Sequence, residues 1–311
     1  MRKTLGIALV LALASATPAS ASFPGRNGRL AFTTYRGDRG RPHIAVVWPS
    51  GKHRRVVTHG SAEDEPTWSP LGSALLFRAL PGTKIGLLRR GRSRILHLGL
   101  PFVGGPEWLP SGRIAFESFT PGVYDGEEID RRGFTARLDG SHRRRVPEEP
   151  LPVWSPDGNR IAFLAPVSSF PCNSLWVARS DGSHRRLVVR AVRRSYYCFP
   201  VDAPDWSPDS RELAFVRTAE GPPTEGFDVG LTADIYTVRA DGKRLRRVTH
   251  EGALYTTFLN PAWSPDGRLI AYNNFPPPPE GPESIFVVRR DGSHRRLVAR
   301  EGVDPSWQPR H

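Results

Sequence analysis

The chain contains 311 residues, with 44 Lys and Arg against 31 Asp and Glu, and its net charge at pH 7 is +13. Its 30 Gly and 31 Pro predict many turns and argue against long helices. The 15 Phe and 8 Trp are too many aromatic residues for a disordered chain. The 2 Cys exclude a disulfide-dense scaffold and a Cys-rich zinc module.

The first 21 residues have the features of a secretory signal peptide. Residues 2–3 are basic, residues 5–16 are apolar, and residues 19–21 (Ala-Ser-Ala) form a small-residue cleavage site. The apolar run is shorter than the about 20 residues that cross a bilayer, and no later segment is long enough. We therefore expect cleavage after Ala21 and an exported protein, periplasmic or extracellular, without a transmembrane segment.

One pattern recurs along the rest of the chain. It consists of Pro-x-Trp, a turn of the Ser-Pro-Asp-Gly type, and an apolar run, and its copies begin at Pro66, Pro106, Pro152, Pro204, Pro261 and Pro305. The last copy lacks its apolar run, and a matching run stands at residues 27–32, near the other end of the chain. A repeat divided in this way is expected if the two ends meet in one sheet and close a ring.

A second hairpin follows each copy, with a Gly-containing turn and then a basic strand. These hairpins occupy residues 43–58, 85–97, 134–146, 175–188, 235–249 and 285–298. Asp-Gly between two apolar runs is a strong hairpin signal. Each unit therefore has four antiparallel strands, and the units together predict an all-β, six-bladed β-propeller over residues 22–311. Its last blade is closed by the N- and C-terminal strands.

The repeat resembles the WD40-like β-propeller repeat of the TolB type, most clearly at residues 152–163, Pro-Val-Trp-Ser-Pro-Asp-Gly-Asn-Arg-Ile-Ala-Phe. TolB proteins also carry an α/β domain ahead of the propeller. Here only a few residues separate the expected cleavage site from the first strand, so the resemblance implies an exported propeller that lacks this domain. The motif is altered at Leu71, at Leu109 and Ser111, and at Ser210, which stands where the motif has Gly and is expected to strain its turn.

Strand direction places the short turns on one face of the ring and the long loops on the other, which we call the upper face. The long loops are residues 36–42, 117–132, 166–173, 191–202, 218–233, 250–259 and 274–283. Long loops on a rigid scaffold commonly bind partners. Acidic and aromatic loop residues either pack the loops onto the blades or bind a partner, and the candidates are Tyr124, Asp125, Glu127, Glu128, Asp130, Tyr196, Tyr197, Phe227, Asp228, Tyr255 and Phe275.

The sequence also bears on disulfides and metals. Cys172 and Cys198 flank the outer strands of one blade, and in an oxidising compartment we expect them to form a disulfide. The carboxylates of residues 125–130 have a composition that suits calcium but lack the ligand spacing of an EF-hand. The 9 His fall largely at repeated positions that a ring separates. We therefore expect no cofactor, with calcium as the remaining option.

Three functions remain open. The favoured one is a monomeric, non-enzymatic module that binds a protein or peptide of the cell envelope through the upper face. The second is a metal-dependent polysaccharide lyase or lactone hydrolase at the channel mouth, where the inner strands supply Glu65, Glu107, Asp202, Asp205, Asn260 and Asp304. The third is a binder of anionic envelope polymer through the Arg pairs of the fourth strands, which otherwise only discourage edge pairing. Nucleic acid is not expected, because no known binding motif is present.

Overall fold

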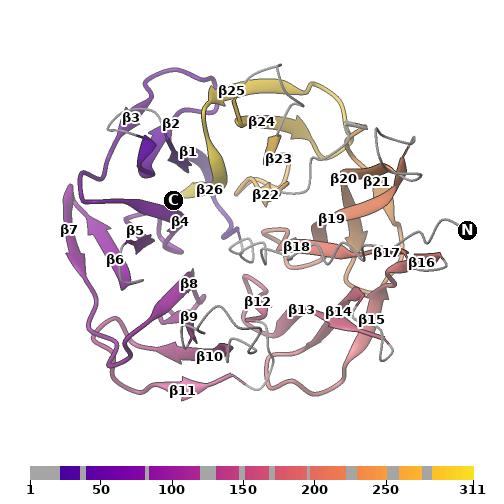
Figure 1. The fold of residues 1–311 in the computed structure, drawn as a ribbon, viewed down its shortest axis with the longest axis horizontal. Coiled ribbons are helices and arrows are strands. Elements are labelled where there is room, and N and C mark those ends of the chain that lie inside the picture. The colour runs from indigo at the N-terminus through magenta and orange to yellow at the C-terminus, as the bar shows by residue number, and fades with distance from the viewer. Residues whose placement is uncertain are drawn as a thin grey trace, which may run out of the picture.

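The Pro-x-Trp repeats form the inner strands of sheets arranged in a ring. The computed structural model describes residues 22–35, 40–80, 84–119, 131–146, 151–167, 172–194, 197–221, 230–250, 259–274 and 282–311. These residues form six four-stranded antiparallel sheets around a common centre, which we number as blades I to VI, and one separate two-stranded sheet (Figure 1). The predicted six-bladed propeller is confirmed.

Blades I to III are each formed by consecutive strands. Blade I contains β4 (Glu63–Trp68), β5 (Ala74–Ala79), β6 (Lys84–Arg89) and β7 (Arg92–Ile95). Blade II contains β8 (Val103–Trp108), β9 (Ile114–Phe119), β10 (Arg131–Ala136) and β11 (Arg144–Arg145). Blade III contains β12 (Val153–Trp154), β13 (Arg160–Pro166), β14 (Asn173–Arg179) and β15 (Arg186–Val189).

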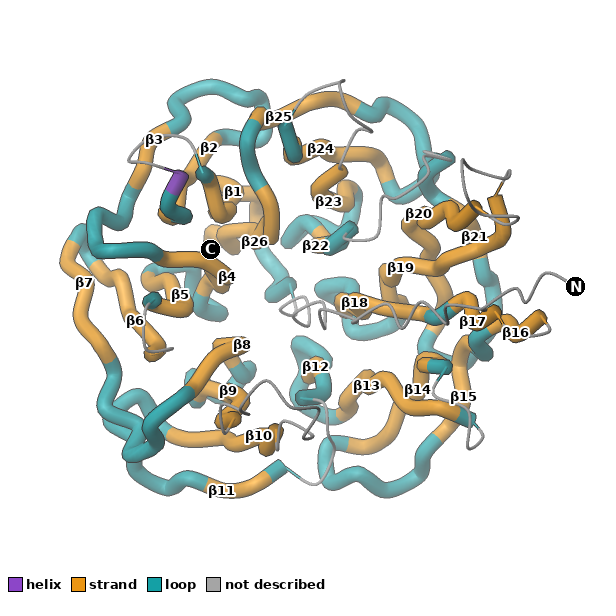
Figure 2. Tube along the Cα trace, in the orientation of Figure 1, coloured by secondary structure: helices purple, strands orange, loops and turns teal. Residues whose placement is uncertain are grey.

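The remaining strands complete the ring. Blade IV contains β18 (Val201–Trp206), β19 (Glu212–Gly221), β20 (Gly230–Arg239) and β21 (Arg246–Arg247). Blade V contains β22 (Ala262–Trp263), β23 (Leu269–Asn274), β24 (Ser284–Arg289) and β25 (Arg296–Arg300). Blade VI contains β26 (Val303–Arg310), β1 (Arg26–Thr34), β2 (His43–Val47) and β3 (Arg55–Val56). Strands and connecting turns account for nearly all of the described chain (Figure 2), and none of it lies in a helix long and apolar enough to cross a membrane.

Blade VI joins the two ends of the chain, as the divided repeat predicts. Strand β26 supplies its inner strand and pairs antiparallel with β1, with Leu30 opposite Trp307. Both of these residues are buried in one core cluster that also contains side chains of blade V. The first and last described strands are therefore adjacent, and the ring is closed by backbone hydrogen bonds within one sheet.

The Trp of the repeat connects neighbouring blades. The indole N–H of Trp206 in blade IV donates to the carbonyl of Val153 in blade III at 3.0 Å. Trp307 makes the equivalent bond to the carbonyl of Ala262 at 3.0 Å. Trp68 and Trp263, at the same position of blades I and V, have buried indole N–H groups without an acceptor in the described part of the chain, so this hydrogen bond joins some neighbouring blades and not all.

Arg side chains of the outer strands also bridge blades. Arg54 lies over the ring of Phe32 in its own blade and donates to the carbonyl of Arg300 in blade V at 2.7 Å. Arg246 of blade IV donates to the carbonyl of Asp291 in blade V at 2.5 Å. Some Arg residues of the predicted fourth-strand pairs therefore hold neighbouring blades together.

The region between β15 and β20 differs from the expected long loops. Residues 218–233 were expected to be a loop, but β19 and β20 continue as a ladder that ends at Gly221 opposite Gly230. Residues 191–202 contain the two-stranded sheet of β16 (Val192–Arg194) and β17 (Tyr197–Phe199). The predicted disulfide is confirmed, because Cys198 of β17 is bonded to Cys172 with a Cα–Cα distance of 5.8 Å.

Candidate functional site

The inner strands begin at the upper face and share a backbone irregularity there. In four blades the residue before the repeat Pro has a positive φ, namely Glu65 (52°), Gly105 (55°), Ala203 (46°) and Asp304 (52°). Each of the four strands has a register shift in its pairing at this point. A residue before Pro normally has extended backbone, and a positive φ is uncommon for residues other than Gly. The bulge belongs to the repeat, whereas the side chain on it varies from blade to blade.

Three carboxylates gather at this level around one guanidinium. Arg78 of β5 donates to both carboxylate oxygens of Asp64, at 2.8 and 2.6 Å. The same guanidinium lies 3.1 Å from Oε1 of Glu65, whose side chain is 9% exposed. The third carboxylate is that of Asp304, which lies close enough to affect the titration of Glu65.

Hydrogen bonds connect these residues across blades V, VI, I and II. Asn260, just before β22, donates to Oδ1 of Asp304 at 2.7 Å, and the hydroxyl of Thr33 donates to Oδ2 at 3.3 Å. The amide of Glu65 donates to the hydroxyl of Thr33 at 3.2 Å. Oε2 of Glu65 accepts from the amide of Gly105 at 3.2 Å. We call Thr33, Asp64, Glu65, Arg78, Asn260 and Asp304 the axial cluster.

Burial makes the axial cluster hold protons at unusually high pH. It raises the pKa of Glu65 to about 8; nearby Arg78 opposes this rise, and Asp64 and Asp304 add to it. Burial, followed by repulsion from Asp64, raises the pKa of Asp304 to about 6. Beside the cluster, burial and then Asp304 raise the pKa of Glu283 to about 7. The carboxylates thus outnumber the cation, and a second cation at this position would relieve their repulsion.

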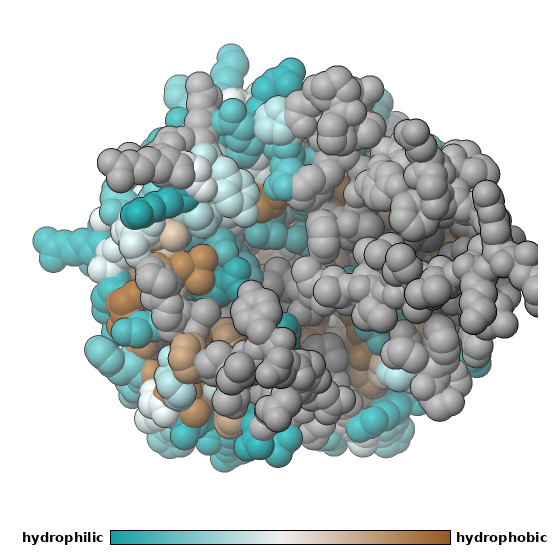
Figure 3. All heavy atoms as spheres, viewed as in Figure 1, coloured by the Kyte–Doolittle hydropathy of each residue, from teal (hydrophilic) through white to brown (hydrophobic). Residues whose placement is uncertain are grey.

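The six predicted inner-strand residues fall into different groups. Glu65, Asn260 and Asp304 come together in the axial cluster. Asp202 lies on β18, where burial raises its pKa to about 6 and the next amide donates to it at 2.8 Å. Glu107 and Asp205 stand one residue before a repeat Trp and are buried deeper in the ring. In Figure 3, hydrophilic described residues border the centre of the ring on the side of β4.

Arg78 and Thr33 were not predicted as site residues. Arg78 directly follows the apolar run Ala74–Phe77. A charged residue directly after such a run is the sequence feature that could have identified Arg78 as a site residue. Of the predicted partner-binding residues, Tyr124, Asp125, Glu127, Glu128, Asp130, Tyr196, Phe227, Asp228, Tyr255 and Phe275 lie outside the described residues, and Tyr197 is described only as part of β17. Within the described ranges, no three His, Cys, Asp or Glu residues are arranged to hold a metal ion.

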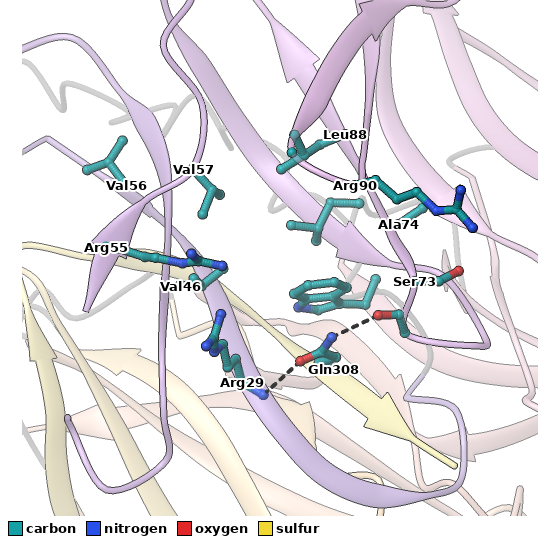
Figure 4. Close-up of a pocket in the computed structure, with 14 residues that line it drawn as sticks. Arg29, Val46, Arg55, Val56, Val57, Ser73, Ala74, Leu88, Arg90 and Gln308 are labelled. Atoms are coloured by element: carbon teal, nitrogen blue, oxygen red, sulfur yellow. Dashed lines mark hydrogen bonds between the residues drawn. The ribbon is translucent and has the colours of Figure 1, made fainter. Parts of the chain in front are cut away.

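A second feature lies at the opposite ends of blades VI and I, between the two blades. A groove of about 360 Å³ is lined by Arg29, Arg55 and Arg90 around an apolar floor that includes Trp68 (Figure 4). Gln308 accepts a hydrogen bond from the amide of Arg29 at 3.2 Å and donates to the carbonyl of Gly72 at 2.8 Å, which joins the two blades. Burial, then repulsion by Arg55 and Arg310, lowers the pKa of Arg29. Positive charge therefore accumulates at this groove.

The protein-family models compared with the chain give no match. Among curated proteins, tricorn protease homolog 1 of Streptomyces coelicolor is 28% identical over 120 residues, which are 39% of this chain and 9% of that protein. The Tol-Pal system protein TolB of Desulfosudis oleivorans is 26% identical over 99 residues, which are 31% of this chain and 19% of that protein. The chain thus matches less than a fifth of the length of either relative.

Solved structures show the same fold over most of the chain. TolB from Acinetobacter baumannii superposes with a TM-score of 0.68 at 14% identity, covering 91% of this chain and 67% of that one. An oligogalacturonate lyase in complex with manganese gives a TM-score of 0.58 at 15% identity, covering 91% and 78%. At these identities the likeness shows the fold alone, which is a six-bladed propeller of the TolB type.

Proposed function

We propose that the protein is an exported, non-enzymatic interaction module that binds a protein or peptide partner at its upper face. The axial cluster holds a basic group of that partner, either a Lys or Arg side chain or an amino terminus. The observation that carries this proposal is the convergence of Asp64, Glu65 and Asp304 around the single guanidinium of Arg78.

The electrostatics of the axial cluster favour a cationic guest. With all three carboxylates ionised, Arg78 balances one charge and leaves the cluster with an excess of two negative charges. In the free protein this excess is relieved by proton uptake at Glu65, whose pKa burial raises to about 8. A bound ammonium or guanidinium group would replace that proton and gain charge-assisted hydrogen bonds in a partly desolvated position.

The architecture supports the same proposal. The cluster stands at the ends of the inner strands, on the face to which strand direction assigns the expected long loops. A rigid ring that carries its long loops on one face is a common arrangement for protein recognition. Export is part of the proposal and rests on the signal-like residues 1–21 and on the Cys172–Cys198 disulfide, which persists in an oxidising compartment.

Peptide binding to charge variants tests the proposal. The purified protein is titrated with a labelled Lys-rich peptide and with a Glu-rich peptide of equal length, and binding is followed by fluorescence anisotropy. We expect only the Lys-rich peptide to bind. The variant Glu65→Gln with Asp304→Asn should weaken binding about tenfold or more, because each lost contact was made by a partly buried carboxylate.

The matched control removes two carboxylates at the lower face. Asp241, which is partly exposed, and Asp291, which is exposed, lie in the short turns of blades IV and V. The variant Asp241→Asn with Asp291→Asn changes the net charge by the same amount and should bind the Lys-rich peptide like the parent protein. Equal weakening in both double variants, or no weakening in the first, contradicts a specific site at the axial cluster.

A second candidate function is favoured by the basic groove, namely binding of an anionic envelope polymer. Arg55 and Arg90 are exposed at its edge, and Arg29, on the same side of the groove as Arg55, lies over the ring of Trp48, 5.2 Å from its centroid (Figure 4). Guanidinium groups bind phosphate or carboxylate groups of a polymer chain, and the binding weakens as salt screens the charges.

Cosedimentation with purified cell-wall material tests this second candidate. The parent protein should pellet with the wall at low salt and remain in solution at high salt. The variant Arg55→Ser with Arg90→Ser should lose most of the low-salt binding. The control variant Arg186→Ser with Arg268→Ser, which removes two exposed charges from blades III and V, should keep it. Equal loss in both variants indicates only a general effect of net charge.

A further inference from the structure

Two carboxylates lie buried on the inner strands at a deeper level than the axial cluster. Glu107 of β8 is 2% exposed and Asp205 of β18 is fully buried. Both occupy the position directly before a repeat Trp, where the other four blades carry Thr67, Val153, Ala262 and Ser306. We call Glu107 and Asp205 the inner carboxylate pair.

Each member of the pair has an oxygen without a hydrogen bond. Oδ2 of Asp205 accepts from the amide of Trp263 at 2.6 Å, whereas Oδ1 of Asp205 and Oε1 of Glu107 are buried and accept none. In the described part of the chain neither carboxylate has an ion-pair partner. Burial raises the pKa of Glu107 well above its usual value, and Asp205 and Glu117 raise it further. A buried charge of this kind is costly unless a cation compensates it.

The beginning of the described chain reaches this pair. The segment before β1 ends at the centre of the ring (Figure 2). The amide of Gly25 donates to the carbonyl of Pro265 in blade V at 3.2 Å, and Phe23 is buried in the core cluster of blades I and II. Ser22 is 5% exposed and lies against Asp205. Burial raises the pKa of Asp205, and the amides of Trp263, Trp206 and Ser22 and the hydroxyl of Ser22 lower it.

Ser22 is also the residue that follows the expected cleavage site. Hydrolysis of the Ala21–Ser22 peptide bond by a signal peptidase consumes one water and leaves a carboxylate on Ala21 and an amino group on Ser22. An unperturbed α-amino group has a pKa of about 8 and therefore carries a proton at neutral pH. The nitrogen that faces Asp205 as an uncharged amide in the uncut chain becomes an ammonium group in the cut chain.

We propose that the α-ammonium group of Ser22, created by cleavage after Ala21, is the counter-ion of the inner carboxylate pair. Cleavage then changes the charge at the centre of the ring by one unit. In the uncut chain the two carboxyl groups avoid repulsion by retaining protons, and in the cut chain the ammonium replaces a proton and ties the N-terminal segment to β18. Processing of the signal peptide thereby stabilises the closed propeller, and this step is independent of any ligand at the upper face.

The first test compares free and blocked N-termini in two backgrounds. The exported protein is first sequenced from its N-terminus, and a start at any residue other than Ser22 overturns the proposal. The protein with a free Ser22 amine is then compared with its Nα-acetylated form by thermal unfolding. Acetylation should lower the Tm by about 5–10 °C, since it leaves buried carboxylates without a counter-ion. In the variant Asp205→Asn this difference should disappear.

Asp202→Asn is the matched control, because Asp202 is a partly buried carboxylate on the same strand whose pKa is shifted by burial and by the amide of Ala203, without a contribution from Ser22. Acetylation should lower the Tm of this variant as much as that of the parent protein. No effect of acetylation on the parent protein, or an equal effect in the Asp205→Asn background, overturns the proposal.

A second measurement works even if Asp205→Asn does not fold. The pKa of the Ser22 amine in the folded parent protein is obtained from the pH dependence of its labelling rate, followed by mass spectrometry. An ion pair with carboxylates raises this pKa above about 8, whereas simple burial lowers it. The titratable group that contacts the amine is Asp205; Glu107 lies close enough to Asp205 to be affected by its charge, and Glu117 acts on Glu107. A pKa below that of the amine in the unfolded chain overturns the proposal.

Discussion

Repeated left-handed residues explain why His recurs at one position of the repeat. His53, His142, His184 and His294 have φ angles of 54–56° and close the Gly-containing turns of four different blades. In these turns the Asp side chain caps the backbone, as where Asp139 accepts from the amide of Ser141 at 2.9 Å. Such turns need a residue that tolerates a positive φ, and His is among the residues enriched there. The repetition therefore follows from turn geometry.

The first prediction concerns Ser210, whose φ of 60° is reached by Gly in the equivalent turns. Its hydroxyl accepts a hydrogen bond from the amide of Asp157 in blade III at 3.1 Å. Both Ser210→Ala and Ser210→Gly remove this bond, but only Gly also relieves the left-handed strain. We expect the Gly variant to be more stable than the Ala variant by about 1 kcal/mol. Urea denaturation measures the difference, and an Ala variant of equal or higher stability contradicts the strain.

The second prediction concerns Asp202, whose pKa burial raises from 3.8 to about 6. A folded-state pKa above the unfolded one means that the protonated carboxyl favours the fold. The stabilisation that this carboxyl contributes to the fold is fully present below about pH 4 and is lost as the pH rises through about 6. Asp202→Asn should remove this loss and stabilise the protein at pH 8 by up to about 3 kcal/mol. Unfolding free energies from pH 4 to 8 measure it. Other carboxyl groups with raised pKa values contribute equally to the parent protein and to the variant. If the unfolding free energies of the two proteins change in parallel with pH, the pKa of Asp202 is not raised.

At the scale of the element, turn chemistry made the blades predictable. In the motif Ser155-Pro-Asp-Gly, the amide of Gly158 donates to the carbonyl of Ser155 at 2.8 Å, and the side chain of Asp157 accepts from the amide of Asn159 at 3.0 Å. Because these bonds are local, the sequence specifies them. The extension of β19 and β20 to Gly221 and Gly230 was missed because Thr218–Gly221 is polar and precedes two Pro, which is typical of a loop.

The axial cluster was predictable only in part. The inner-strand carboxylates Glu65 and Asp304 follow from their place before the repeat Pro. Their contacts do not, because Glu65 and Asp304 lie on blades that meet only when the ring closes. The bulge that presents them puts a non-Gly residue at positive φ directly before Pro, which local backbone preferences disfavour. Local rules therefore fail at the point where long-range contacts determine the backbone.

The third prediction concerns the disulfide, which ties β17 to the residue before β14. Cys172 and Cys198 are separated by 26 residues, and closing a loop of that length stabilises a fold by about 3 kcal/mol in the chain-entropy model. Replacing both Cys by Ser should lower the unfolding free energy by about that amount. Urea denaturation of this variant measures it, with the parent protein under reducing conditions as a second comparison. Unchanged stability in both experiments would show that the unfolded chain is not constrained by the bond.

At the scale of the whole molecule, each blade rests mainly on its two neighbours, so the joint at blade VI determines the stability of the ring. Strand β26 contributes to both neighbouring interfaces. The hydroxyl of Ser306 accepts from the amide of Trp68 in blade I at 3.2 Å, and the indole of Trp307 donates to Ala262 in blade V at 3.0 Å. The C-terminal strand is therefore structural on both sides of its own sheet.

The last prediction removes this joint. A chain ending at Asp304 loses the buried Trp307 and the hydrogen bonds of Ser306 and Gln308 to blade I. Loss of one buried Trp alone costs about 3–5 kcal/mol, so we expect the Tm to fall by at least about 10 °C. The control is a chain ending at Pro309, which loses only the exposed Arg310 and His311. Its Tm should lie within a few degrees of that of the parent protein, because changes at exposed residues usually have small effects on stability. Calorimetry measures both truncations. Since an open ring exposes the facing surfaces of blades V and I, equal Tm values for the two truncations would mean that the other five interfaces hold the fold without closure.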